Sequence, residues 1–159
     1  MEVPMRVGKR RAESGYTFVA VLIALALIML GLSIAGPLWS QQIRREREQE
    51  LLRIGSLYAD AIARYHDTSP GSLKQYPVEL HSLLLDTRFV GVQRHLRQLY
   101  TDPVSPGQAW ATVQDTEGRI IGVYSRSGDT PLGSGTRMNP EFASAKHYSD
   151  WKFIAKVKS

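Results

Sequence analysis

Cysteine is absent from this chain of 159 residues, and its absence excludes several kinds of chemistry at once. Without a thiol there is no disulfide, no thiolate ligand for a metal and no cysteine nucleophile. An absence of cysteine fits a reducing and an oxidising compartment equally well. The compartment therefore has to be inferred from the N-terminal part of the chain.

Charge is also absent from the whole stretch between Ser14 and Ile43. Four of the 20 basic residues and two of the 15 acidic residues lie before Tyr16, which leaves 16 and 13 in the rest. That remainder is only mildly basic and has no basic stripe interleaved with aromatic residues, so we expect no nucleic-acid partner. The basic leader instead indicates a membrane topology signal.

The apolar run from Phe18 to Leu38 has the length of a membrane span. Its 21 residues would form a helix of about 31 Å, which matches a hydrocarbon core of about 30 Å. The basic leader predicts a cytoplasmic N-terminus, although three arginines beyond the run oppose that orientation (Arg44, Arg45 and Arg47). The alternative is a secretory signal cleaved after Ser33-Ile34-Ala35, but its apolar core would be unusually long.

The stretch SGYTFVAVLIALALI, which starts at Ser14, resembles the N-terminal signature of the type IV pilin and type II secretion pseudopilin superfamily. The resemblance implies cleavage by a prepilin peptidase between Gly15 and Tyr16, followed by N-methylation of Tyr16. It also implies a helix kink at Pro37, and a proline there would remove a backbone hydrogen bond in any case. A simple break at the membrane exit explains Pro37 equally well.

Ala20 departs from the family pattern. It is the fifth residue of the processed chain, where the family usually has a glutamate that pairs with the amino terminus of a neighbouring subunit. A carboxylate inside the span costs about 2.5–3.5 kcal/mol unless it is paired. Alanine avoids that cost but cannot make the pairing. The sequence therefore leaves two interpretations open: the chain is a specialised or minor subunit, or its helix packs on neighbouring helices through apolar and small residues without the ion pair.

Beyond the span, residues 42–65 predict a continuation of the same helix. Apolar residues recur on one side at helical spacing, and the charged run RREREQE predicts a wet opposite side with Arg44–Glu48 and Arg47–Glu50 pairs. The turn-rich sequence after Asp67 predicts the helix end. The expected apolar face comprises Ile43, Leu51, Ile54, Tyr58, Ile62 and Tyr65.

The remaining sequence predicts a small antiparallel sheet. Residues 110–114 and 119–125 read as a hairpin around Asp115–Gly118, and residues 151–157 alternate between apolar and mostly polar. Between the helix and the hairpin we expect short helical or irregular pieces, with Leu80, Leu83 and Leu84 in the core.

We therefore expect an α+β, pilin-like fold in which an N-terminal helix, membrane-spanning in its first half, packs on the sheet. The expected organisation is a leader at 1–15, a helix at 16–66 with its span at 18–38, and a periplasmic domain at 67–159.

No pattern in the sequence points to catalysis. The four histidines have no helical pairing that would suggest a metal site, and Ser125, Ser127 and Ser134 lie in neither a GxSxG nor an SxxK motif. We expect no enzyme, no catalytic residue and no cofactor. Family analogy suggests calcium in a late loop only weakly, because Asp129 is the sole carboxylate between Ser125 and Pro140.

The resemblance implies a structural subunit of a type II secretion system that assembles through its N-terminal helix into a short filament. Its partners would be a prepilin peptidase, other pseudopilins or pilins, and an inner-membrane assembly platform. A minor pilin of a type IV pilus, or an exported or singly anchored periplasmic binding domain, are the alternatives.

Overall fold

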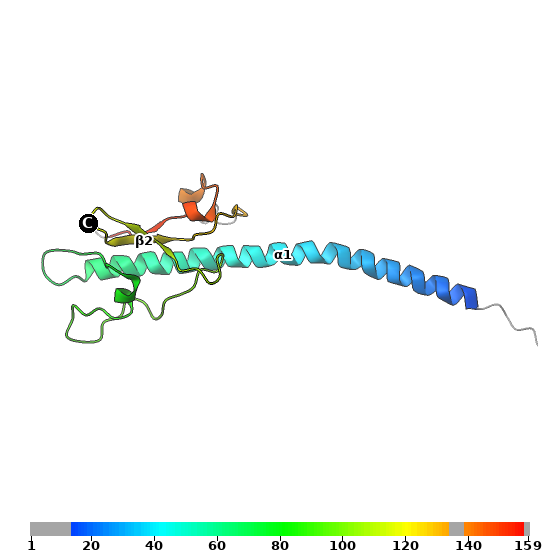
Figure 1. Cartoon of the computed structure of the whole chain (residues 1–159), viewed down its shortest axis with the longest axis horizontal. Helices are drawn as coiled ribbons and strands as arrows, with labels where there is room; N and C mark the ends of the chain where they lie inside the picture. Colours follow the sequence, from blue (N-terminus) through cyan, green and yellow to red (C-terminus); the bar gives the residue numbers. More distant parts are fainter. Residues whose placement is uncertain (1–13, 134–138, 158–159) are drawn as a thin grey trace, which may run out of the picture. The chain divides into compact units, whose positions relative to one another are not determined.

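The structure is a computed structural model that describes residues 14–133 and 139–157; for residues 14, 15 and 32–38 it describes the backbone alone. Contacts divide the chain into two units, residues 1–42 and residues 43–159. The elements are α1 (Ser14–Asp67), η1 (Leu80–Leu83), β1 (Ala111–Gln114), β2 (Ile120–Tyr124), η2 (Pro140–Phe142), η3 (Tyr148–Asp150) and β3 (Phe153–Ile154) (Figure 1).

Helix α1 ends at Asp67, as the turn-rich sequence after it predicts. Polar groups cover its last carbonyls, since the Thr68 hydroxyl donates to Arg64 O at 2.7 Å and the Lys74 ammonium donates to Asp67 O at 2.8 Å. These bonds satisfy acceptors that a helix end leaves without intrahelical partners. Cations near the C-terminus also suit the helix dipole.

The second unit is built on the apolar face of α1. Five of the six predicted face residues are buried, namely Leu51, Ile54, Tyr58, Ile62 and Tyr65. Their spacing of three or four residues places them on one side of the helix, against the sheet and the loops. The prediction is wrong for Ile43, which is 37% exposed because it precedes the first core position of this unit.

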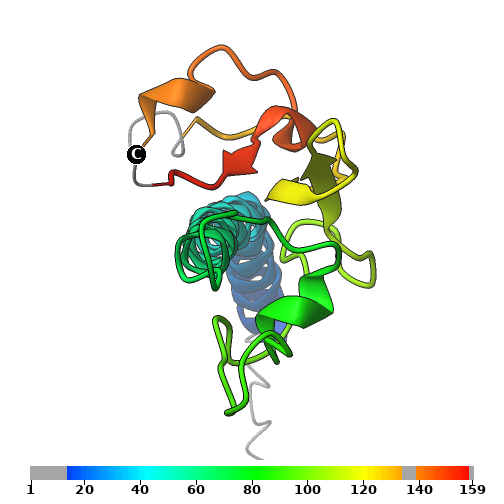
Figure 2. The same cartoon turned by 90° about the vertical axis from the view of Figure 1, so that its left-hand side faces the viewer.

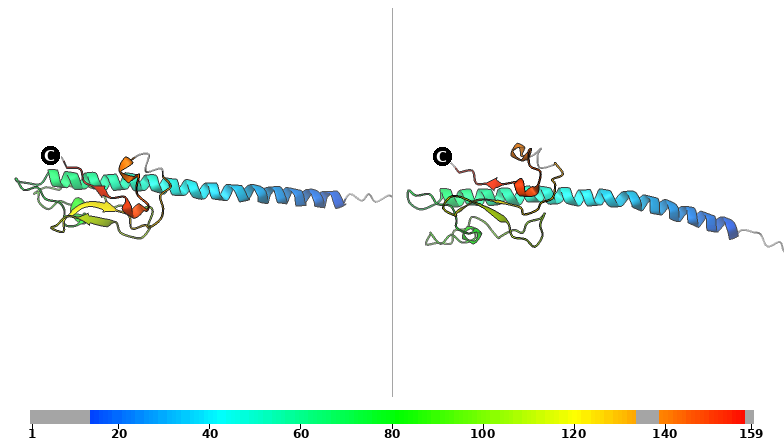
Figure 3. Two further views of the ribbon diagram at one scale, coloured as in Figure 1. Left: turned by 90° about the horizontal axis from the view of Figure 1, so that it is seen from above. Right: turned by 45° about the horizontal axis from the view of Figure 1, so that its top comes forward.

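Three antiparallel strands, in the order β1-β2-β3, run alongside the C-terminal part of α1 (Figure 3). The predicted hairpin is confirmed, with β1 pairing β2 and a turn at Asp115–Gly118. The Asp115 carboxylate accepts hydrogen bonds from Glu117 N and Arg119 N, and Gly118 supplies the positive φ of 77°. This is the turn chemistry expected of an Asp followed by a Gly.

The last strand is shorter than the alternation suggests. Burial alternates from Trp151 to Lys156 as predicted, but only Phe153 and Ile154 pair with β2, and one further bond joins Ala155 N to Ile121 O. The Phe153 ring lies against α1 at Gly55, where an added Cβ would come within 2.5 Å of it. A glycine at position 55 thus lets the sheet approach the helix closely.

Between α1 and the hairpin the chain is irregular apart from η1, as predicted. Leu83 is fully buried, and Leu80 and Leu84 pack against the core while partly exposed.

A helix together with a three-stranded antiparallel sheet confirms the predicted α+β class with a small antiparallel sheet.

Candidate functional site

Large apolar side chains are exposed along α1 in the first unit. From Tyr16, which is 82% exposed, to Leu30, none of the large hydrophobic residues is buried. These side chains point in all directions around the helix. Packing of another segment against one side of the helix would therefore cover only some of them. An apolar surface of this extent needs an apolar environment or partner helices.

The sequence-predicted site residues all lie on α1. Tyr16 and Ala20 are exposed, and their spacing of four residues puts them on the same helix face. The side-chain surroundings of Gly15 and Pro37 lie outside the described residues. No cavity or cluster joins these positions within the described part of the chain, so what they share is the helix.

Among the residues that the structure describes, no helix combines the length and the apolar character of a membrane span. In the same residues no three His, Cys, Asp or Glu side chains are grouped so that they could hold a metal ion. In the weakly suggested calcium loop, Asp129 uses its backbone to bond Ser127 and Tyr148.

The main feature that the sequence did not reveal is a set of three buried carboxylates that hold the loops of the second unit in place. The first is Glu48, which the charge run placed on the wet side of α1. It is fully buried, and its Oε2 accepts hydrogen bonds from Leu132 N at 2.8 Å and the Tyr148 hydroxyl at 3.0 Å. The wet-face prediction is therefore wrong at Glu48, whereas Glu50 is exposed and pairs with Arg53 at 2.6 Å.

Tyr148 stays a hydrogen-bond donor at any ordinary pH. Burial, followed by the neighbouring Glu48 charge, raises the pKa of the Tyr148 hydroxyl to about 12. The neutral phenol can thus serve the buried carboxylate, which would be costly to bury without donors.

The second carboxylate, Asp102, organises the loop that precedes the hairpin. It is buried, and it accepts Val104 N at 2.9 Å, Ser105 N at 3.2 Å and the Ser125 hydroxyl at 2.6 Å. Because Ser125 is itself fully buried and donates to a carboxylate, it is a structural hydroxyl and not an accessible nucleophile. The Asp102-Pro103 dipeptide is the sequence signal that could have predicted this turn, because an Asp side chain often accepts hydrogen bonds from the backbone amides two and three residues further along the chain.

The third carboxylate, Asp86, fixes the loop after η1 to the end of α1. Arg88 donates to both of its oxygens, at 2.8 and 2.6 Å, and His95 Nε2 lies 3.1 Å from Oδ2. The same guanidinium reaches Tyr65 O at 2.8 Å and lies 3.5 Å from the Tyr65 ring centroid. A helix end, a carboxylate and a stacked arginine thereby form one network.

This network predicts acid sensitivity. Hydrogen bonds from Arg88 outweigh the opposing effect of burial and lower the pKa of Asp86 to about 2. The pKa of Asp86 is lower in the folded chain than its usual value of 3.8, so the ionised carboxylate stabilises the fold at pH values above 3.8. This contribution to the free energy of unfolding is lost as the pH falls toward 2. We expect the advantage of the wild type over Asp86→Asn, measured by chemical unfolding, to shrink by about 2 kcal/mol between pH 5 and pH 2. A difference that stays constant over this range would contradict the assignment.

Three of the four histidines make separate local contacts in the structure. His66 lies beside Asp67 and Tyr76, His95 beside Asp86, and His147 Nδ1 lies 2.6 Å from Gly128 O. Each is engaged locally, and these contacts provide no pair of histidines for shared chemistry.

Comparison with known proteins adds no relative, since no family model, no curated protein and no solved structure matches this chain.

Proposed function

We propose that this protein is a pseudopilin-like structural subunit of a type II secretion system. In this proposal residues 18–38 hold the chain in the bacterial inner membrane, with the N-terminus in the cytoplasm and the second unit in the periplasm. A prepilin peptidase removes residues 1–15, and the new amino group of Tyr16 is methylated. The mature chain then assembles with other pseudopilins on an inner-membrane platform.

The observation that supports the proposal most is the exposure of apolar side chains all around α1 from Tyr16 to Leu30. Lipid tails can cover such a surface before assembly, and neighbouring helices can cover it afterwards. The uncharged sequence of the run and the basic leader before it fit the same role.

The function would be mechanical and not catalytic. The bilayer keeps subunits available, the platform moves them into a short filament, and the α+β units form the outer surface of that filament. Ala20 is exposed on α1 and cannot offer a carboxylate to a neighbouring amino terminus. This feature favours a minor or specialised subunit, in a secretion system or in a type IV pilus.

Intact-mass measurement with N-terminal sequencing tests the proposal, on chain purified from whole cells of a bacterium that has a prepilin peptidase, so that membrane-bound and exported forms are both recovered. We expect a mature chain that begins at methylated Tyr16. A chain that begins at Gly36 would indicate export by a signal peptide, and an uncut Met1 would indicate a plain anchor. Either result would refute the proposal. Co-purification with a secretion platform or with pili then distinguishes the two assemblies.

A further inference from the structure

Three exposed arginines lie within one turn of α1 at the start of the second unit. None of Arg44, Arg45 and Arg47 makes an ion pair with a residue that the structure describes. We call residues 44–47 the arginine turn. No other four consecutive residues in the described part of the chain include three arginines or lysines. The arginine turn is therefore the densest run of positive charge in that part of the sequence.

The glutamates that the sequence offers to these arginines are engaged elsewhere. Glu48 is buried and accepts a hydrogen bond from Tyr148, and Glu50 pairs with Arg53. The ion pairs that the sequence predicts between these two glutamates and the arginine turn are absent among the described residues. Glu46 lies within the turn itself, and three arginines with one glutamate leave a net charge of plus two on its four residues.

The rest of the second unit, as far as the structure describes it, forms no ion pair with the arginine turn. Asp129 lines the same small cavity of about 50 Å³ as Arg44 and Arg47, but it is within ion-pair distance of neither. Seen along α1, the strands and loops of the unit lie around part of the helix and leave the rest open (Figure 2). Positive charge that its own chain leaves without an ion pair attracts an anionic partner.

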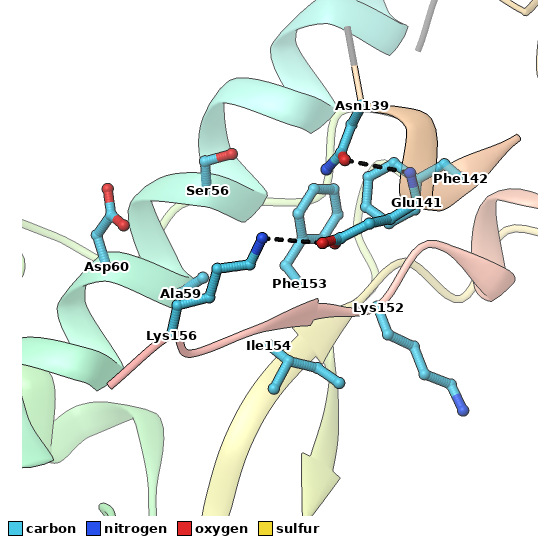
Figure 4. Close-up of a pocket in the computed structure, with 10 residues that line it drawn as sticks. All are labelled: Ser56, Ala59, Asp60, Asn139, Glu141, Phe142, Lys152, Phe153, Ile154 and Lys156. Atoms are coloured by element: carbon cyan, nitrogen blue, oxygen red, sulfur yellow. Dashed lines mark hydrogen bonds and ion pairs between the residues drawn. The ribbon is translucent and has the colours of Figure 1, made fainter. Parts of the chain in front are cut away.

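Basic side chains elsewhere on the second unit are paired or stand singly. Lys156 pairs with Glu141 at 2.9 Å beside β3 (Figure 4). Lys152 is exposed and points away from Lys156 in the same view. Paired or single cations of this kind are ordinary on a solvated surface, so the arginine turn is the cationic feature that calls for a partner.

The arginine turn directly follows the long uncharged stretch, which ends at Ile43. Arg44 is six residues beyond Leu38, which is about 9 Å along a helix. The headgroup layer on each side of a bilayer is about 5–8 Å thick, and a long arginine side chain can reach back to it. In the first unit, Trp39 is 73% exposed, and tryptophan is enriched where a membrane meets water. A bilayer that took up residues 18–38 would therefore place its headgroups within reach of the arginines.

We propose that the arginine turn binds the phosphate groups of anionic phospholipids at the periplasmic face of the inner membrane. Guanidinium groups form paired hydrogen bonds with phosphate oxygens. Each arginine beside an anionic leaflet strengthens the contact by a factor of about five. The inference rests on the proposed function, because it needs residues 18–38 in the bilayer, and it adds the class of lipid that holds the start of the second unit at the membrane surface. It also gives a role to the three arginines that oppose the predicted orientation.

Native mass spectrometry tests this contact on the full chain, released from micelles that contain phosphatidylglycerol and phosphatidylcholine in equal amounts. Both lipids carry a phosphate, but only phosphatidylglycerol has a net negative charge. The wild type should retain phosphatidylglycerol in preference, and the variant with Arg44→Gln, Arg45→Gln and Arg47→Gln should lower that preference at least about fivefold. The basic leader, where present, is the same in both chains and cancels in the comparison. Equal retention of the two lipids by the wild type, or an unchanged preference in the variant, would overturn the proposal.

The matched control removes three positive charges from other exposed positions, with Arg94→Gln, Arg97→Gln and Lys152→Gln. It has the same net charge as the arginine-turn variant and should keep the lipid preference of the wild type. None of the side chains replaced in either variant makes an ion pair within the described ranges, so both variants should fold as the wild type does. An equal loss of preference in the control would show that total charge selects the lipid, and it would refute the role of the arginine turn.

A second copy of the chain is the competing partner, since acidic side chains could take the place of the phosphates. In nanodiscs of phosphatidylcholine alone, the number of chains per particle should be the same for the wild type and the arginine-turn variant. Multimers that form in the wild type and not in the variant would assign the arginine turn to a protein contact and overturn the lipid contact.

The N-terminal sequence of the same samples separates this inference from the proposed function. A chain that begins at methylated Tyr16 but shows no lipid preference refutes the lipid contact and leaves the pseudopilin-like role standing. An uncut chain whose lipid preference depends on the arginine turn refutes that role and supports the lipid contact.

Discussion

Replacement of Glu48 by alanine is expected to destabilise the second unit by about 3 kcal/mol. The change removes the acceptor of Leu132 N and of the Tyr148 hydroxyl, which lie 2.8 and 3.0 Å from the carboxylate. The buried Tyr148 hydroxyl costs about 1–3 kcal/mol when it is left without a partner, and hydrogen bonds to a charged group lie at the upper end of the usual range. Leu132 is 39% exposed, so the loss at Leu132 N adds less. The free energy of unfolding, from denaturant titration of the full chain in detergent, measures the loss.

Glu50→Ala is the matched control for this prediction. Glu50 is on the same helix and is 43% exposed in its salt bridge with Arg53. An exposed pair at this spacing contributes about 0.3–0.5 kcal/mol, so the control should be nearly silent. Equal losses in the two variants would show that helix content, and not the buried carboxylate, accounts for the effect.

Tyr148→Phe refines the test, because it removes one donor and leaves Leu132 N bonded to the carboxylate. We expect a smaller loss than for Glu48→Ala. If the two residues act together, the double variant should lose less than the sum of the single variants. Strict additivity would indicate that the 3.0 Å contact adds nothing to stability.

The sequence predicted well those parts of the fold that depend on local patterns. The helix end at Asp67, the turn at Asp115–Gly118 and the alternation after Trp151 follow from turn residues and from apolar periodicity, and the structure confirms them. Such signals involve neighbours within a few residues, so a single sequence is enough to predict them.

What the sequence missed depends on partners far along the chain. Glu48 looks like any other residue of a charged helix face until η3, about a hundred residues away, supplies Tyr148. The same holds for Arg88, which reaches back 23 residues to the end of α1. The spacing of apolar residues cannot reveal a buried carboxylate that is stabilised by hydrogen-bond partners. The prediction of a helix face assumes that charged residues are exposed, and a buried charge is an exception to that rule.

The proposed processing site depends on local sequence alone, and Gly15→Val should abolish cleavage between residues 15 and 16. A glycine leaves the peptide backbone open on both sides, and a branched side chain beside the scissile carbonyl would fill the space that a peptidase needs to approach it. The uncharged run from Phe18 onward is unchanged, so the variant should still enter the membrane. Intact mass of the membrane fraction should therefore shift from the trimmed chain to the full-length chain.

Gly31→Ala is the control for a general effect of losing a glycine on this helix. An added Cβ at Gly31 meets nothing within 4 Å, and alanine is the better helix former, so cleavage should proceed as in the wild type. Continued cleavage of Gly15→Val at the same bond would refute the assignment of Gly15. Loss of cleavage in both variants would instead indicate that α1 fails to insert into the membrane. Positions 15 and 31 are 16 residues apart, so a local peptidase site does not explain an effect that both substitutions share.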